Sequence, residues 1–71
     1  MNILLKDGKT VLNYSGISGF CLDGAVIRYR LIGTEDDLVM ALFNTKEKAE
    51  EEFKRLVFSL KSGKIFHTIK G

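Results

Sequence analysis

The sequence predicts an α+β fold, in which four or five antiparallel strands form a meander sheet and one C-terminal helix packs on one face of it. Two observations predict this fold. Short apolar runs separated by glycine-containing turns fill residues 2–43, and an apolar stripe at helical spacing follows over residues 45–62. We expect one small domain over residues 1–71, with residues 64–71 as either a short final strand or a loosely held extension.

The turns mark the strands. Residues 3–5 and 10–14 flank Asp7-Gly8 and predict a first hairpin. Residues 17–22 and 25–32 flank Asp23-Gly24, which is the strongest hairpin signal in the chain because both residue types tolerate a positive φ. A polar connection over residues 33–36 then leads to a fourth strand over residues 37–43.

The helix is marked at its two ends and along one side. Asn44 or Thr45 can cap its free amide groups, Glu47 suits the positive end of the helix dipole, and Gly63 is placed to end it. The apolar positions that would face the sheet follow a helical period: Ala49, Phe53, Leu56, Val57 and Leu60. The acidic run of residues 50–52 is expected to be solvated.

Composition excludes several classes of protein. Eleven Lys and Arg residues against nine Asp and Glu give a net charge of only +2, which argues against nucleic acid as a partner. One cysteine, Cys21, excludes an internal disulfide, and the single His67 excludes a multi-histidine metal site. The N-terminal apolar run is too short for a signal peptide or a membrane span. We therefore expect a cytoplasmic protein that needs no metal and no cofactor.

No residue pattern predicts catalysis, so we expect a binding protein rather than an enzyme. Small chains bury little surface when they fold alone, and a homo-oligomer, such as a dimer, is therefore expected as well. The stretch IRYRLI, residues 27–32, places two arginines and a tyrosine in a strand. Strand alternation puts Tyr29 on the helix-covered face and both arginines on the opposite face.

The uncovered sheet face is the candidate binding surface. In the register we expect, Arg28 and Arg30 lie there with Val39 and Phe43, a mixture of arginine and apolar residues that is typical of protein interfaces. Two other interpretations stay open. Arg30 could reach diagonally to Asp37, so that both arginines only solubilise the surface. Alternatively, both could bind a phosphate or carboxylate group.

The order of motifs resembles that of small proteins encoded by phages, prophages and mobile elements of Gram-positive bacteria. The segments that carry the likeness are DGKTVLNY, LDG, FNTKEKAEEEF and SLKSGKIFH, which together span nearly the whole chain. Phe43 and Lys48 depart from the pattern. The matching residues are structural: Asp7, Gly8, Asn13, Tyr14, Thr45, Glu47 and Ala49.

The resemblance implies a binding function, because small proteins of this kind bind a host defence protein or sequester a signalling molecule. Three hypotheses follow. The first is a stoichiometric inhibitor of a host anti-phage protein, for example of a CRISPR system, which acts through the uncovered sheet face. The second is an oligomeric sponge, in which Arg28, Arg30 and Tyr14 from neighbouring chains surround a nucleotide-like anion. The third is a nucleic-acid-binding regulator, which the low net charge disfavours.

Overall fold

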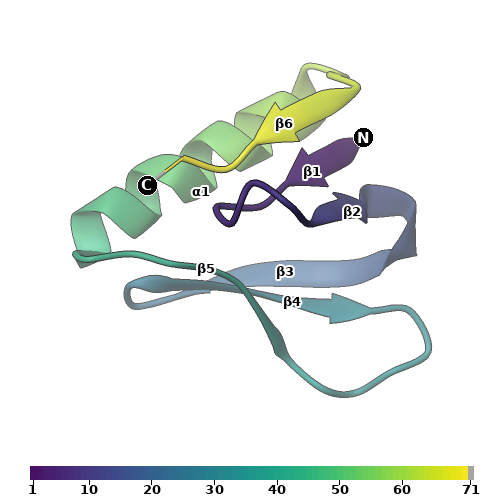
Figure 1. Ribbon diagram of the computed structural model, residues 1–71, viewed down its shortest axis with the longest axis horizontal. Helices are drawn as coiled ribbons and strands as arrows, with labels where there is room; N and C mark the ends of the chain where they lie inside the picture. The colour runs from purple at the N-terminus through teal and green to yellow at the C-terminus, as the bar shows by residue number, and fades with distance from the viewer. Residues whose placement is uncertain (71) are drawn as a thin grey trace.

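The computed structural model describes residues 1–70 and contains two three-stranded sheets and one long helix (Figure 1). The strand order is β2-β1-β6 in the first sheet and β3-β4-β5 in the second. The elements in chain order are β1 (Asn2–Leu4), β2 (Val11–Asn13), a 3-10 turn η1 (Tyr14–Gly16), β3 (Ile17–Asp23), β4 (Val26–Leu31), β5 (Leu38–Leu42), α1 (Lys46–Lys61) and β6 (Phe66–Thr68).

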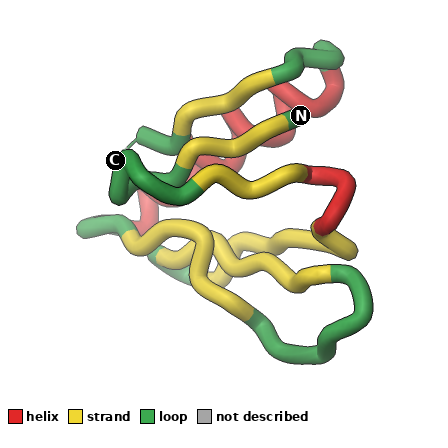
Figure 2. The backbone as a smooth tube through the Cα atoms, turned by 45° about the vertical axis from the view of Figure 1, so that its right-hand side comes forward, coloured by secondary structure: helices red, strands yellow, loops and turns green. Residues whose placement is uncertain are grey.

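The prediction of one meander is correct for the second sheet and wrong for the chain as a whole. The β1–β2 hairpin forms as expected, but η1 then turns the chain out of the first sheet. Asn13 holds this turn, since its side-chain oxygen accepts a hydrogen bond from the Ser15 amide at 3.0 Å. Consequently β3 starts a separate sheet (Figure 2).

The C-terminal tail supplies the third strand of the first sheet, beside β1 and on the side away from β2. Residues 66–68 form β6, which pairs with β1 in parallel, Ile3 lying opposite His67. A parallel pair needs a long crossover, and the chain from β2 to α1 provides it. The helix is therefore not the last element. The last residue of the predicted tail, Gly71, lies outside the described residues.

The β3–β4 hairpin forms at the predicted place, but its register differs by two residues from the one in which Asp23-Gly24 is the two-residue loop and Leu22 pairs with Ala25. Asp23 pairs with Val26, so the loop residues are Gly24 and Ala25. Gly24 has a φ of 59°, and no residue other than glycine has a positive φ among residues 1–70. Glycine in the first loop position is typical of a type II′ turn, which spares Asp23 the strained conformation. Because the shift is even, the two faces of β4 stay as predicted.

A bulge in β5 reverses the predicted faces of its end. Arg28 pairs with Val39 and Ile27 with Ala41, which leaves Met40 as the extra residue. Beyond the bulge the alternation is inverted. Leu42, expected inside, is 64% exposed, and Phe43, expected on the uncovered face, is only 5% exposed. A second bulge at Ser18 likewise turns Ile17 into the core.

The core lies between the two sheets and the helix. Its buried apolar residues come from both sheets, the helix and the C-terminal tail: Ile3, Ile17, Ile27, Met40, Ala41, Phe43, Ala49, Leu56 and Ile69. The helix bounds agree with the predicted range to within one residue, and Thr45 is the cap, its hydroxyl accepting a hydrogen bond from the Lys48 amide. Within residues 1–70, no helix has the length and apolar character needed to cross a membrane.

Candidate functional site

The outward side of the second sheet faces away from the core. We call it the outer face, and it consists of Gly19, Cys21, Val26, Arg28, Arg30, Val39 and Leu42. Cross-strand pairing defines it, since Cys21 and Val39 both lie opposite Arg28. Of its apolar members, Leu42 is 64% and Val39 52% exposed. An antiparallel sheet with one solvated face normally carries polar residues there, so these two side chains stand out.

The two arginines of the outer face are both held by carboxylates of the same sheet. The Nη2 and Nε groups of Arg30 donate to Oδ1 of Asp37 at 2.8 and 3.1 Å, as the diagonal pairing predicted. The Nε group of Arg28 donates to Oδ2 of Asp23 at 3.1 Å. Because all four groups are substantially exposed, these pairs add little to stability. They fix the direction of both guanidinium groups along the sheet.

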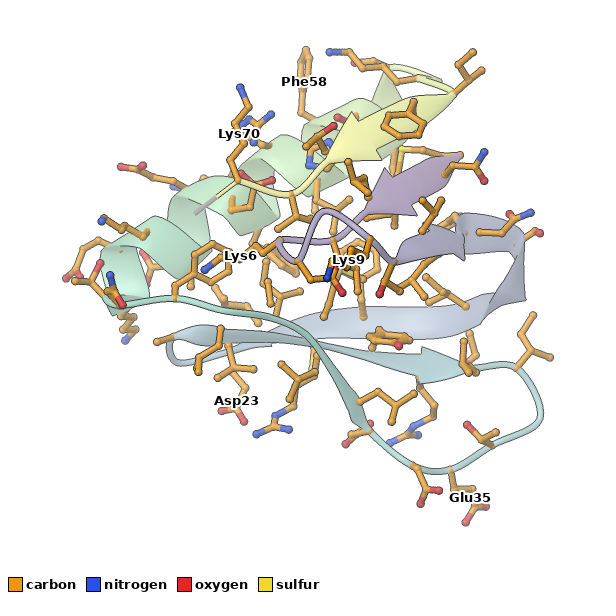
Figure 3. The ribbon with its side chains drawn as sticks, viewed as in Figure 1. Lys6, Lys9, Asp23, Glu35, Phe58 and Lys70 are labelled. Atoms are coloured by element: carbon orange, nitrogen blue, oxygen red, sulfur yellow. The ribbon has the colours of Figure 1, made fainter. Side chains whose placement is uncertain are left out.

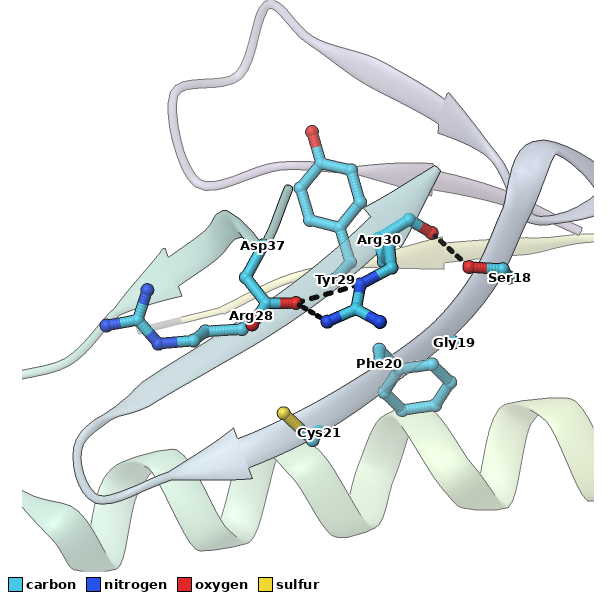
Figure 4. Close-up of a pocket in the computed structure, with 8 residues that line it drawn as sticks. All are labelled: Ser18, Gly19, Phe20, Cys21, Arg28, Tyr29, Arg30 and Asp37. Carbon is cyan, nitrogen blue, oxygen red and sulfur yellow. Dashed lines mark hydrogen bonds and ion pairs between the residues drawn. The ribbon is translucent and has the colours of Figure 1, made fainter. Parts of the chain in front are cut away.

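Tyr29 points away from the arginines between which it lies in the sequence (Figure 4). It lies opposite Phe20, on the side that faces the core. Tyr29 and the two arginines therefore lie on opposite faces of β4, as strand alternation predicted.

Tyr14 does not join the arginines either. Its ring packs edge-on against Phe20, with 6.2 Å between centroids, and Phe20 in turn packs against Phe53 of the helix at 5.5 Å. Tyr14 therefore lies on the core side of the second sheet. Of the residues predicted to bind, Arg28, Arg30 and Val39 share one face, whereas Phe43 and Tyr14 do not belong to it within a single chain.

A shallow hollow of about 220 Å³ lies over the arginine end of the outer face. The residues that line it are Ser18, Gly19, Phe20, Cys21, Arg28, Tyr29, Arg30 and Asp37 (Figure 4). The Asp37 carboxylate already occupies the Nε and Nη2 edge of the Arg30 guanidinium and offsets its charge, which weakens the attraction of Arg30 for a phosphate. The chemistry of this hollow is thus that of a mixed polar and apolar contact surface rather than of an anion pocket.

The structure contains a buried polar network that was not predicted from the sequence. Ser59 and Glu52 of α1 hydrogen-bond the two ring nitrogens of His67 in β6, at 2.7 Å to Nδ1 and 2.8 Å to Nε2, and each of the three residues is 4% exposed. Arg55 forms an ion pair with the other Glu52 oxygen. With Glu52 ionised, Nε2–H donates to its carboxylate and the Ser59 hydroxyl donates to Nδ1.

The network fastens the tail to the helix. Serine, histidine and a carboxylate occur together in hydrolases, but here the Ser59 hydroxyl is bonded to Nδ1 of His67 and its residue is buried. The expectation that residues 50–52 are all solvated is wrong for Glu52. A signal was present, because Glu52 and Ser59 share the helical stripe of Ala49 and Leu56 at spacings of three and four residues.

No metal-ligating cluster accompanies either site: the described residues contain no group of three or more His, Cys, Asp or Glu side chains that could hold a metal ion. Cys21 is exposed on the outer face, far in the fold from the His67 network. A scan against protein-family models, a search of the curated proteins and a search of the solved structures each returned no match.

Proposed function

We propose that this chain is a non-enzymatic binding protein of the kind encoded by phages and mobile elements, and that it inhibits a host defence protein by stoichiometric binding through the outer face. The observation that carries the proposal is the exposure of Val39 and Leu42 beside two oriented arginines. Arginine and well-exposed apolar residues are what a protein interface buries at its centre.

The geometry supports this class over the sponge. A sponge for a nucleotide-like anion needs unpaired cations that converge, whereas Arg28 and Arg30 each have a carboxylate partner in the same sheet. Those same ion pairs suit a protein partner, because they hold the long side chains in place and reduce the entropy lost on binding. Tyr14, which the sponge would also use, packs against Phe20.

The test compares two surface variants with one matched control. Val39→Asp and Leu42→Asp each place a charge in the outer face, and Val11→Asp places the same charge at an equally exposed valine of the other sheet. Each tagged protein is used to capture partners from a lysate of a Gram-positive bacterium, and circular dichroism checks the fold. We expect the outer-face variants to lose a partner that the wild type and Val11→Asp retain.

Equal capture by all four proteins would exclude the outer face as the interface. The same variants test self-association, because a homodimer that used this face would become monomeric in Leu42→Asp by light scattering. Phe43→Asp is not a suitable variant. It would bury a charge in the core and unfold the protein, whatever the interface is.

A further inference from the structure

The charges of the chain are divided sharply along its length. Residues 1–52 contain all nine Asp and Glu side chains and six of the Lys and Arg residues, a side-chain balance of −3. Residues 53–71 contain the other five Lys and Arg residues and no acid, a balance of +5. The overall charge of +2 therefore conceals a basic C-terminal part.

The fold gathers four of these five cations around one exposed aromatic ring. We call this surface the basic patch, and it consists of Lys54, Arg55, Phe58, Lys61 and Lys64. Phe58 is 63% exposed and projects outward from α1, on the opposite side of the molecule from Asp23 and Glu35 (Figure 3). A phenylalanine of this exposure contributes little to the core.

The lysines of the basic patch lie close to the Phe58 ring and are free to bind an anion. Lys54 and Lys61 lie one helical turn before and after Phe58, and Lys64 Nζ lies 5.9 Å from the centre of its ring. Of the four cations in the basic patch, only Arg55 has a carboxylate partner among residues 1–70, namely Glu52. The three lysines are therefore not neutralised locally within the part of the chain that the structure describes.

Phe58 takes part in the lining of two hollows. The one lined by Lys54, Arg55, Ser59 and Lys64 measures about 350 Å³, and the one between Phe58, Val57 and Lys61 about 360 Å³. The Phe58 side chain thus borders two hollows, each of which is also lined by lysines. This is the arrangement in which a base stacks on the ring while its phosphates reach the cations.

We propose that the basic patch binds single-stranded nucleic acid, with one base stacked on Phe58 and the adjacent phosphates on Lys54, Lys61 and Lys64. A duplex would use the cations but leave the ring without a role, because its bases are already stacked. A membrane surface would need a broad apolar face on the helix, and α1 exposes one aromatic ring among several charges. The proposal is independent of the outer face.

The experiment measures fluorescence anisotropy of a labelled oligothymidylate of about ten nucleotides, a length within the usual site sizes. We expect the wild type to bind it, with a slope of log K against log salt of about −2 for three neutralised phosphates. Phe58→Ala should weaken binding about five-fold or more, as the loss of one stack does. Lys54→Ala and Lys61→Ala should each make the salt slope shallower.

Two controls match these variants. Lys9→Ala removes the same charge from the β1–β2 turn, and Val39→Ala truncates an exposed apolar residue of the outer face. Both should bind the oligonucleotide like the wild type. The proposal is overturned if the wild type does not bind it, if Phe58→Ala leaves affinity unchanged, or if the protein binds only the matched duplex or only vesicles of anionic lipid.

Discussion

At the scale of single residues, the best-defined feature is a carboxylate buried between two donors. Glu52 accepts a hydrogen bond from His67 and forms an ion pair with Arg55. The other ring nitrogen of His67 is hydrogen-bonded to Ser59. In Glu52→Ala the imidazole Nε2 loses its partner inside the protein, which costs about 1–3 kcal/mol of unfolding free energy. Urea denaturation measures this loss.

Glu51→Ala is the matched control for that prediction, since it removes the same group one position earlier on the exposed side of the helix. Surface substitutions of this kind change stability by about 0.5 kcal/mol or less. If Glu52→Ala proved no more destabilising than Glu51→Ala, the network would have to be open to water in solution.

A second residue-scale prediction concerns the carboxylate of the first turn. The Thr10 hydroxyl donates to Asp7 at 2.6 Å, and the amides of Lys9 and Thr10 donate as well, which lowers the pKa of Asp7 below its usual value. These bonds stabilise the fold above the unfolded pKa, and their contribution disappears as the pH falls through the lower, folded value.

Thr10→Val removes the largest cause of this shift. We expect the Asp7 pKa to rise toward its usual value in that variant while both amide bonds persist, and an NMR titration of the side-chain carboxyl carbon would record it. An unchanged titration curve would show that the Thr10 hydroxyl does not hold the carboxylate.

At the scale of elements, the sequence predicts local structure better than pairing. Asp7-Gly8, Gly24 and Thr45 act within a few residues of themselves, and the two hairpins and the helix occur where they indicate. The bulge at Met40 has no such mark, because an extra strand residue is set by how the side chains on both faces fit the core. The exchange of Leu42 and Phe43 was not predictable for that reason.

The bulge gives a clear pair of expectations. Phe43→Ala empties a buried site that Lys6 Nζ covers at 4.7 Å from the ring centre, and it should cost about 3–5 kcal/mol of unfolding free energy. Leu42→Ala truncates an exposed side chain and should cost about 0.5 kcal/mol or less. Similar losses in both variants, measured by urea denaturation, would contradict the inverted alternation.

At the scale of the whole molecule, two properties depend on residues that are distant in sequence. Net charge averages over a basic patch and an acidic remainder, so the total of +2 concealed the surface around Phe58. Likewise, the parallel pairing of β1 with β6 joins the two ends of the chain, and no short-range signal announces it. The outer face could be predicted in part because strand alternation alone places Arg28, Arg30 and Val39 together.

The pairing of the chain ends makes the fold depend on its last residues. Truncation after Gly63 removes β6, exposes the site of the buried Ile69 and leaves Glu52 and Ser59 without His67. Burial of one such apolar side chain contributes about 1.5–3 kcal/mol, and each buried polar group left unpaired costs about 1–3 kcal/mol. The sum is comparable with the whole stability of a chain of this size, about 4–10 kcal/mol.

We therefore expect the chain truncated after Gly63 to lose cooperative unfolding altogether, which thermal denaturation followed by circular dichroism would show. Truncation after Ile69 is the control, because it removes the exposed Lys70 and leaves β6 and the His67 network in place. A sharp transition in the shorter chain would mean that the other strands and α1 form a stable core without β6. The parallel β1–β6 pair would then be an addition to the fold rather than the closure of it.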